Sequence, residues 1–320
     1  MRSTKAGIAA TAALGAAAFA AVPTGGTALA QGACKPATNI EAIIDDSGSM
    51  AGTDRNRLRD QGINLLINKP ANANKKLGAV AFGSSATQVF APLPIGSSIG
   101  PIGAALAART LDDGSTYYER AFAAASAGNP TADARIFLTD GEPTDSGGGW
   151  QGGPKTYTVG LGLTANGSGE TLLKGIASGT GGAYVRADSD ATLQAAINDV
   201  DAFLNCKAVP KRYSDTFTKT GSKSHSLPIS RGIKTVELTL TWASPTDQLD
   251  IVGVSQSTKG KASAAARRVK VTKRSGSTFV SAKISRIKKG KLKFKVRLKK
   301  KGTPFLPVTA TTQATRSKTR

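Results

Sequence analysis

Oxygen-bearing side chains alternate along a short turn near the start of the chain, and two more occur in later turns. The candidate ligands are two carboxylates and three hydroxyls: Asp45, Ser47, Ser49, Thr116 and Asp140. Gly48, between the two serines, permits a tight backbone turn. An all-oxygen set suits a hard cation and leaves room for an outside carboxylate to complete its shell. The pattern therefore predicts a site for Mg²⁺, with Mn²⁺ or Ca²⁺ as substitutes.

The sequence offers few residues for other kinds of functional site. The chain has one histidine and two cysteines, which argues against a zinc site, a haem or a histidine-based catalytic centre. Ser98 lies in a pattern similar to a nucleophile elbow, but no buried strand precedes it and its triad would need the distant His225. We therefore expect a protein that is not an enzyme.

The elements that must position these oxygens alternate between strand and helix patterns. Strands are predicted at 40–44, 77–82, 87–90, 135–138, 157–161 and 183–185, and helices at 58–66, 99–108, 117–125, 172–177 and 193–204. This alternation predicts an α/β domain with a mostly parallel sheet covered on both faces. Two strands run directly into Asp45 and Asp140, and ligands bind beyond the carboxyl ends of such strands.

The Asp-x-Ser-x-Ser turn, the later threonine and the Thr-Asp-Gly turn together resemble the von Willebrand factor A domain, in its secreted bacterial form. The resemblance covers Cys34 to Cys206 and implies a doubly wound, Rossmann-like fold with a metal-ion-dependent adhesion site. It implies that Ser47 and Ser49 bind the metal directly and that Thr116 does so in one state. Asp45 and Asp140 would act directly or through water, and an acidic group of the ligand would take the sixth position.

Two features of the turn favour other outcomes. A Ser-Gly-Ser turn after a strand can serve only to cap the next helix, without binding metal. Asp46 departs from the family pattern, and its added negative charge beside the turn is expected to weaken carboxylate ligands.

Residues 1–30 have the pattern of a signal peptide. Arg2 and Lys5 precede an uncharged, alanine-rich segment, and Ala28-Leu29-Ala30 offers small residues for cleavage. No later apolar run approaches the ~18 residues of a membrane-spanning helix. We expect a secreted or cell-envelope-associated protein in which Cys34 and Cys206 form a disulfide. Closing that loop would contribute about 4–5 kcal/mol in the chain-entropy model.

The charge is concentrated in the second part of the chain. Residues 207–320 hold 28 Lys and Arg against 4 Asp and Glu, whereas residues 1–206 have a net charge of −2. This difference predicts a domain boundary near Cys206. The predicted organisation is a signal peptide (1–30), an A-type domain (34–206) and a basic domain (207–320) with a short basic C-terminal tail.

The basic domain has strand patterns of period two. Apolar and polar residues alternate over 236–242, which predicts a half-buried strand. A later strand places Leu292, Phe294, Val296 and Leu298 on one face, and its opposite face holds five cations: Lys291, Lys293, Lys295, Arg297 and Lys299. Short strands of this kind separated by turn residues predict a small all-β, sandwich-like domain.

The five cations have two interpretations. Charged residues on edge strands protect a sheet from aggregation, which needs no ligand. A net charge this high instead favours a surface for anionic envelope polymers or lipid headgroups. Nucleic acid is electrostatically suitable but is not expected outside the cell.

Three functions follow from these patterns. The first is metal-dependent adhesion, in which the first domain binds an acidic group of an extracellular protein through Mg²⁺. The second is a structural envelope protein held by the charge of its basic domain. The third is a non-catalytic arm of a secreted enzyme system.

Overall fold

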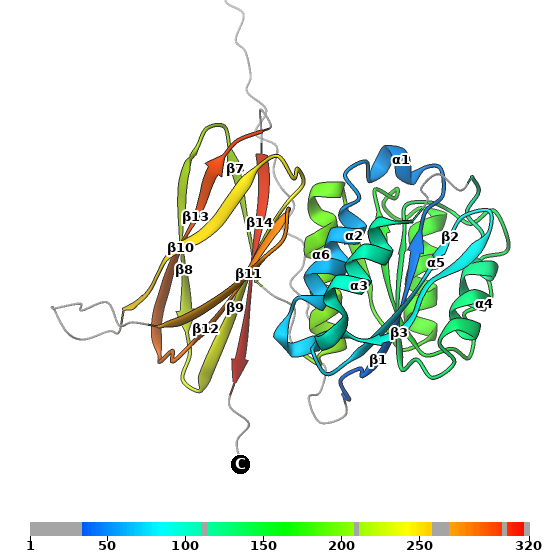
Figure 1. Cartoon of the computed structure of the whole chain (residues 1–320), viewed down its shortest axis with the longest axis horizontal. Coiled ribbons are helices and arrows are strands. Elements are labelled where there is room, and N and C mark those ends of the chain that lie inside the picture. Colours follow the sequence, from blue (N-terminus) through cyan, green and yellow to red (C-terminus); the bar gives the residue numbers. More distant parts are fainter. Residues whose placement is uncertain (1–33, 110–113, 208–210, 258–268, 303–305, 317–320) are drawn as a thin grey trace, which may run out of the picture.

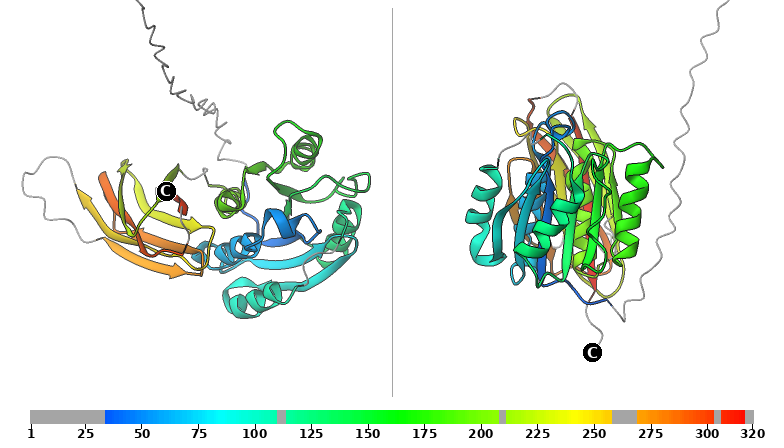
Figure 2. Two further views of the ribbon diagram at one scale, coloured as in Figure 1. Left: turned by 90° about the horizontal axis from the view of Figure 1, so that it is seen from above. Right: turned by 90° about the vertical axis from the view of Figure 1, so that its right-hand side faces the viewer.

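The computed structural model describes residues 34–109, 114–207, 211–257, 269–302 and 306–316. The predicted signal peptide and the last residues of the basic tail lie outside the described residues. Within the described part of the chain, no helix is long and apolar enough to cross a membrane. The described residues form an α/β domain and a β-sandwich that lie side by side (Figures 1 and 2).

A six-stranded sheet, which we call sheet A, forms the centre of the first domain. Its strands are β1 (Asn39–Asp45), β2 (Lys76–Phe82), β3 (Ala86–Pro94), β4 (Ala134–Thr139), β5 (Lys155–Leu161) and β6 (Tyr184–Ala187). They are arranged in the order β3-β2-β1-β4-β5-β6. All neighbours pair in parallel except the edge strand β3, which is antiparallel to β2. The prediction of a mostly parallel sheet is confirmed.

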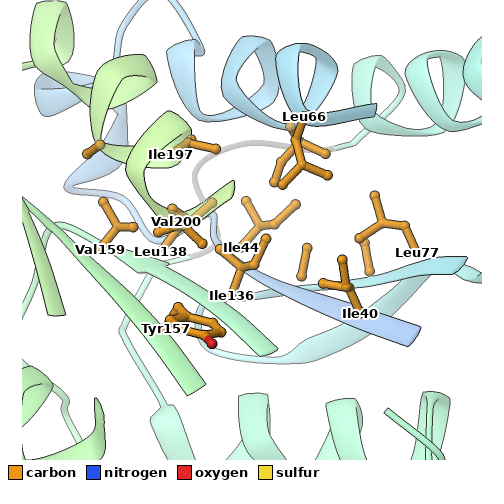
Figure 3. Packing of buried hydrophobic residues seen from close by; sticks show 14 of the residues in the cluster. Ile40, Ile44, Leu66, Leu77, Ile136, Leu138, Tyr157, Val159, Ile197 and Val200 are labelled. Atoms are coloured by element: carbon orange, nitrogen blue, oxygen red, sulfur yellow. The ribbon is translucent and has the colours of Figure 1, made fainter. Parts of the chain in front are cut away.

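Helices cover both faces of sheet A, as expected for a doubly wound fold. They are α1 (Met50–Thr53), α2 (Leu58–Ile67), the 3₁₀ turn η1 (Pro70–Asn72), α3 (Ile95–Ala107), α4 (Tyr118–Gly128), α5 (Ser168–Gly179) and α6 (Asp190–Leu204). One core cluster joins α2, α3 and α6 to the sheet through Leu66, Ile102 and Ile197 (Figure 3). A second cluster joins α4 and α5 to the opposite face through Phe122 and Leu173.

Strand β1 is buried on both faces. Ile40 and Ile44 pack toward α2 and α6, whereas Ile43 packs toward the aromatic cluster beneath α4. A parallel strand covered on both sides needs apolar residues in both directions, so its sequence forms an almost continuous apolar run. This central strand leads directly into the turn that begins at Asp45.

The second domain consists of two antiparallel sheets. Its strands are β7 (Lys211–Phe217), β8 (Gly221–Ile229), β9 (Ile233–Trp242), β10 (Gln248–Ser257), β11 (Lys270–Ser275), β12 (Phe279–Ser285), β13 (Gly290–Lys300) and β14 (Leu306–Arg316). Sheet B has the order β11-β12-β9-β14-β7, and sheet C has the order β10-β13-β8. Leu240 of sheet B and Phe294 of sheet C belong to one buried core between the sheets. The predicted sandwich architecture is therefore present.

The expected disulfide lies at the junction of the two domains. Cys34 and Cys206 are bonded, with their Cα atoms 5.8 Å apart. The Ala37 amide also donates to the Leu204 carbonyl at 2.9 Å, which brings the start of the first domain against the end of α6. Both ends of this domain are therefore held together beside the first strand of the sandwich.

Helix α6 packs against the outer face of sheet B (Figure 1). Gln194 donates to Thr278 Oγ1 at 2.7 Å, and Asn198 donates to Thr311 Oγ1 at 2.8 Å. Thr239 and Thr241 of β9 are 3 % and 1 % exposed. The prediction that β9 is half-buried is wrong, because the first domain covers its polar face.

Candidate metal centre

Three loops meet at the carboxyl edge of sheet A. The first begins where β1 ends at Asp45, the second precedes α4 and contains Thr116, and the third follows β4 and begins at Asp140. Strands β1 and β4 are parallel neighbours, so their following turns must lie side by side. The fold thus brings residues that are far apart in the sequence to one place.

Backbone hydrogen bonds join these loops. The Gly48 amide donates to the Gly114 carbonyl at 2.9 Å, which connects the first loop to the second. The Thr144 amide donates to the Thr116 carbonyl at 2.8 Å, and the Thr116 amide donates to Thr144 Oγ1 at 3.1 Å. This reciprocal pair connects the second loop to the third, so the positions of the candidate ligands are fixed by the protein itself.

The candidate ligands contact one another. Ser49 Oγ donates to Asp140 Oδ1 at 2.7 Å, and Ser47 Oγ lies 3.1 Å from Ser49 Oγ. A Cβ atom built on Gly141 would lie 3.5 Å from Thr116 Oγ1 and 3.8 Å from Ser49 Oγ. The two hydroxyls therefore lie beside a position that has no side chain of its own.

Asp45 lies deepest among the candidate ligands. It is fully buried, and it accepts hydrogen bonds from the Ser47 amide at 2.8 Å and from Thr139 Oγ1 at 2.6 Å. Burial raises the pKa of Asp45 to about 6, and the nearby negative charge of Asp140 adds a smaller increase. A bound cation would oppose both effects, because it favours the ionised carboxylate.

Three threonines position the candidate ligands and were not predicted. Thr139 holds Asp45, and Thr53 donates from α1 to Asp140 Oδ2, while Thr144 supports Thr116. Thr139 was recognisable as a polar residue that ends an otherwise apolar strand. Thr53 lies four residues after Ser49, a spacing that places both on one side of a helical turn, but only if α1 is known to exist.

Asp46 is directed away from these oxygens. It is 2 % exposed, and Arg59 contacts its carboxylate at 3.0 Å while Arg109 lies 3.4 Å away. Arg59 also pairs with Asp54 at 2.9 Å. Two buried guanidinium groups thus balance the charge of Asp46, which argues against the expectation that Asp46 weakens carboxylate ligands, although that expectation remains a prediction.

The donors fit a hard divalent cation. They are carboxylate and hydroxyl oxygens, and the nearby arginines pair with Asp46, Asp54 and Asp60 rather than with Asp45 or Asp140. Ser49 is exposed and Asp140 is half-buried, whereas Asp45 and Ser47 are buried. One side of the cluster is thus open to an incoming group, as a shared metal ligand would require.

No protein-family model matches the chain, and a search of curated proteins found no match. Among solved structures, it is similar to a von Willebrand factor type A protein from Catenulispora acidiphila, with a TM-score of 0.44 and 16 % identity over 83 % of this chain and 58 % of that one. It is also similar to the pilus adhesin SpaC from Lactobacillus rhamnosus GG, with a TM-score of 0.44 and 15 % identity over 89 % of this chain and 45 % of that one.

An aerotolerance-related membrane protein from Bacteroides fragilis gives a TM-score of 0.41 and 21 % identity over 51 % of this chain and 98 % of that one. The chain spans about half the length of the Catenulispora acidiphila protein and of SpaC. Likenesses at these TM-scores carry no argument about function, so the assignment depends on the site.

The remaining candidates lie elsewhere. Ser98 is in α3 and His225 is in β8, where it contacts Asp215 Oδ2 at 2.7 Å. The elbow pattern thus lies inside a helix, away from the only histidine of the chain. The five cations of residues 291–299 lie on β13, and every one of them is exposed.

Proposed function

We propose that this protein is a secreted or envelope-associated adhesion protein that is not an enzyme. Its first domain would hold Mg²⁺, or Mn²⁺ or Ca²⁺, and bind an acidic group of an extracellular protein. The residues assigned to the ion are Asp45, Ser47, Ser49, Thr116 and Asp140. Within this cluster, the hydrogen bond between Ser49 and Asp140 is the observation that carries the proposal, because it joins the first and third loops at the open side.

The residues have distinct parts in this proposal. Ser47, Ser49 and Thr116 would offer neutral hydroxyl oxygens, so that the bound ion keeps affinity for a carboxylate from outside. Asp45 and Asp140 would supply the negative charge that retains the ion, and Thr139 and Thr53 would hold their carboxylates in position. The bound ion supplies electrostatic attraction for an acidic oxygen of the partner.

Calorimetric titration with Mg²⁺ tests the site directly. Ser49→Ala and Asp140→Asn should each weaken Mg²⁺ binding by more than about tenfold, since each removes an oxygen ligand or its charge. Both variants should keep the circular dichroism spectrum of the wild-type protein, because the two residues lie in loops at the sheet edge.

Matched substitutions elsewhere control for general effects. Ser178→Ala changes a hydroxyl on the exposed side of α5, and Asp188→Asn changes a carboxylate that is paired with Arg186. Neither should alter Mg²⁺ affinity. If both Ser49→Ala and Asp140→Asn kept the Mg²⁺ affinity of the wild-type protein, the assignment of the metal site would be wrong.

The adhesive role has its own test. Binding of the purified chain to a panel of immobilised extracellular proteins should require Mg²⁺, be abolished by chelator and be lost in Asp140→Asn. Binding that persists in chelator would contradict the proposed role even if Mg²⁺ itself binds.

A further inference from the structure

The cationic strand β13 is the centre of sheet C and not its edge. It pairs with β10 on one side and with β8 on the other. Protection of an exposed edge therefore does not explain its lysines. Its side chains alternate strictly: Leu292, Phe294, Val296 and Leu298 are buried in the sandwich core, and the cations between them point outward.

Serine hydroxyls flank the row of cations on both sides. On β8, Ser222, Ser224 and Ser226 lie opposite Arg297, Lys295 and Lys293. On β10, Ser255 and Ser257 lie opposite Lys293 and Lys291. Directly opposed residues of antiparallel strands share a face, so cations and hydroxyls form one continuous polar surface, which we call the cationic face.

Four of the five cations have no acidic partner within the described residues. Lys299 lies 3.0 Å from Asp250, which also pairs with Lys273 at 2.7 Å. The other acidic residues of the sandwich are engaged elsewhere: Asp215 with His225, Glu237 with Ser281 and Asp247 with the Gly302 amide. Arg297 forms no ion pair in the described part of the chain but lies directly opposite Asp250, so Lys291, Lys293 and Lys295 form the uncompensated row of positive charge.

The cationic face is the open side of the sandwich. The outer face of sheet B is covered by α6, whereas sheet C lies on the side away from the first domain (Figures 1 and 2). A partner of the sandwich can reach the cationic face without disturbing the contact between the domains.

The chemistry of the cationic face indicates which class of partner it would bind. Alternate residues of a strand recur about every 6.7 Å, so the cations form a straight line of evenly spaced charges. Lysine binds phosphate as a point charge, and the flanking hydroxyls can donate hydrogen bonds to phosphate oxygens. We propose that the cationic face binds an extended polymer that carries a phosphate in each repeat and has no nucleobases.

Two other anionic partners fit less well. The outward positions on these strands hold no aromatic side chain, so the face offers no surface on which nucleobases could stack. Its apolar outward residues are Pro228 and the half-buried Val252, which provide little for insertion into a lipid layer.

Binding of the full chain to long-chain inorganic polyphosphate tests the proposal. Fluorescence anisotropy at several NaCl concentrations, with chelator present, should show an affinity that falls steeply with salt because bound counterions are released. Lys291→Gln, Lys293→Gln and Lys295→Gln in one variant should weaken binding at least tenfold and reduce the log–log salt slope by about 2 to 3.

A second triple variant separates this face from the net charge of the domain. Lys234, Lys270 and Lys283 are exposed lysines on sheet B, and changing them to Gln removes the same total charge. This control should keep its affinity within about threefold of wild type, because its charges lie off the proposed path.

Three results would overturn the proposal. One is an equal loss in the two triple variants, which would indicate diffuse attraction. The others are tighter binding of the wild-type chain to single-stranded DNA or to anionic phospholipid vesicles than to polyphosphate. Because chelator is present throughout, a negative result here would not bear on the proposal of metal-dependent adhesion.

Discussion

Ser49 and Asp140 are 91 residues apart in the chain, yet their side chains are joined by a 2.7 Å hydrogen bond. The donors that hold Asp45 and Asp140 are hydroxyl and amide groups, whereas the adjacent Asp46 takes its donors from arginine. A carboxylate held by neutral donors keeps its net charge for another cation. This difference between neighbouring aspartates is what makes the cluster suitable for a metal ion.

Glu41 is a second unusual carboxyl group of β1. It is fully buried, and within the described residues neither of its oxygens has a hydrogen-bond partner. A Cβ atom on Gly78 of β2 would lie 2.2 Å from Glu41 Oε2, so the side chain occupies space that only a glycine leaves open. Burial raises the pKa of Glu41 to about 7, against smaller opposing effects of the Asn129 side chain and of the Arg135 charge.

Glu41→Gln should therefore remove a pH-dependent loss of stability. The pKa of Glu41 is higher in the folded state than in the unfolded state. Ionisation of Glu41 therefore does not change the free energy of unfolding below about pH 4.5. It lowers the free energy of unfolding progressively up to about pH 7, by about 3 kcal/mol. Urea unfolding across this range should show the variant gaining on wild type as pH rises. A constant difference between the two proteins would contradict the raised pKa.

The sequence predicts the meeting of Asp45 and Asp140 because parallel neighbouring strands end at one edge. It does not predict the pairing of Asp46, since that depends on Arg59 and Arg109, which reach it from separate elements. Contacts determined by strand order can be inferred from pattern, whereas contacts determined by helix placement cannot.

Strands β9 and β13 show the same limit at the scale of elements. Both alternate between apolar and polar residues, and the apolar side of each faces the sandwich core. The polar side of β13 is exposed, whereas Thr239 and Thr241 on the polar side of β9 are buried beneath α6. Alternation of apolar and polar residues shows that the two faces of a strand differ in polarity, but it does not show what covers each face.

The buried amides of α6 should contribute to the stability of this contact. Asn198 donates to Thr311 Oγ1 at 2.8 Å and accepts a hydrogen bond from Lys69, which is itself paired with Asp201 at 2.6 Å. Asn198→Ala should leave buried polar groups unsatisfied and lower the free energy of unfolding by about 1–3 kcal/mol. Urea denaturation followed by circular dichroism measures this change.

Asn56→Ala provides the comparison, because Asn56 is exposed. Its effect should remain within about 0.5 kcal/mol of zero. If the two variants were equally stable, the contact between α6 and sheet B would contribute nothing measurable.

At the scale of the molecule, the charge difference between the two parts of the chain predicts a boundary near Cys206. In the structure, α6 ends at Leu204 and β7 begins at Lys211. The arrangement of the two domains was not predictable, because their contact is formed largely by polar and charged side chains that resemble surface residues. It places the candidate metal centre and the cationic face in different domains, so one chain can engage two partners.

The disulfide gives this arrangement a mechanical consequence. If the sandwich is attached to a polymer and the metal centre to another protein, tension enters the first domain at Cys206. The bond to Cys34 passes that tension to the start of β1, and the end of β1 carries the Asp45 turn. The load then runs along the central strand, whose hydrogen bonds to β2 and β4 resist in shear and must break together.

Without the disulfide, the same pull would act on the end of α6 and peel the helix away turn by turn. Single-molecule pulling between the Asp140 loop and the sandwich should therefore give a higher unfolding force for the oxidised chain than for the reduced chain. Equal forces would mean that the load does not pass through β1. A single covalent bond at the base of the domain would thus decide whether an adhesive contact holds or yields under strain.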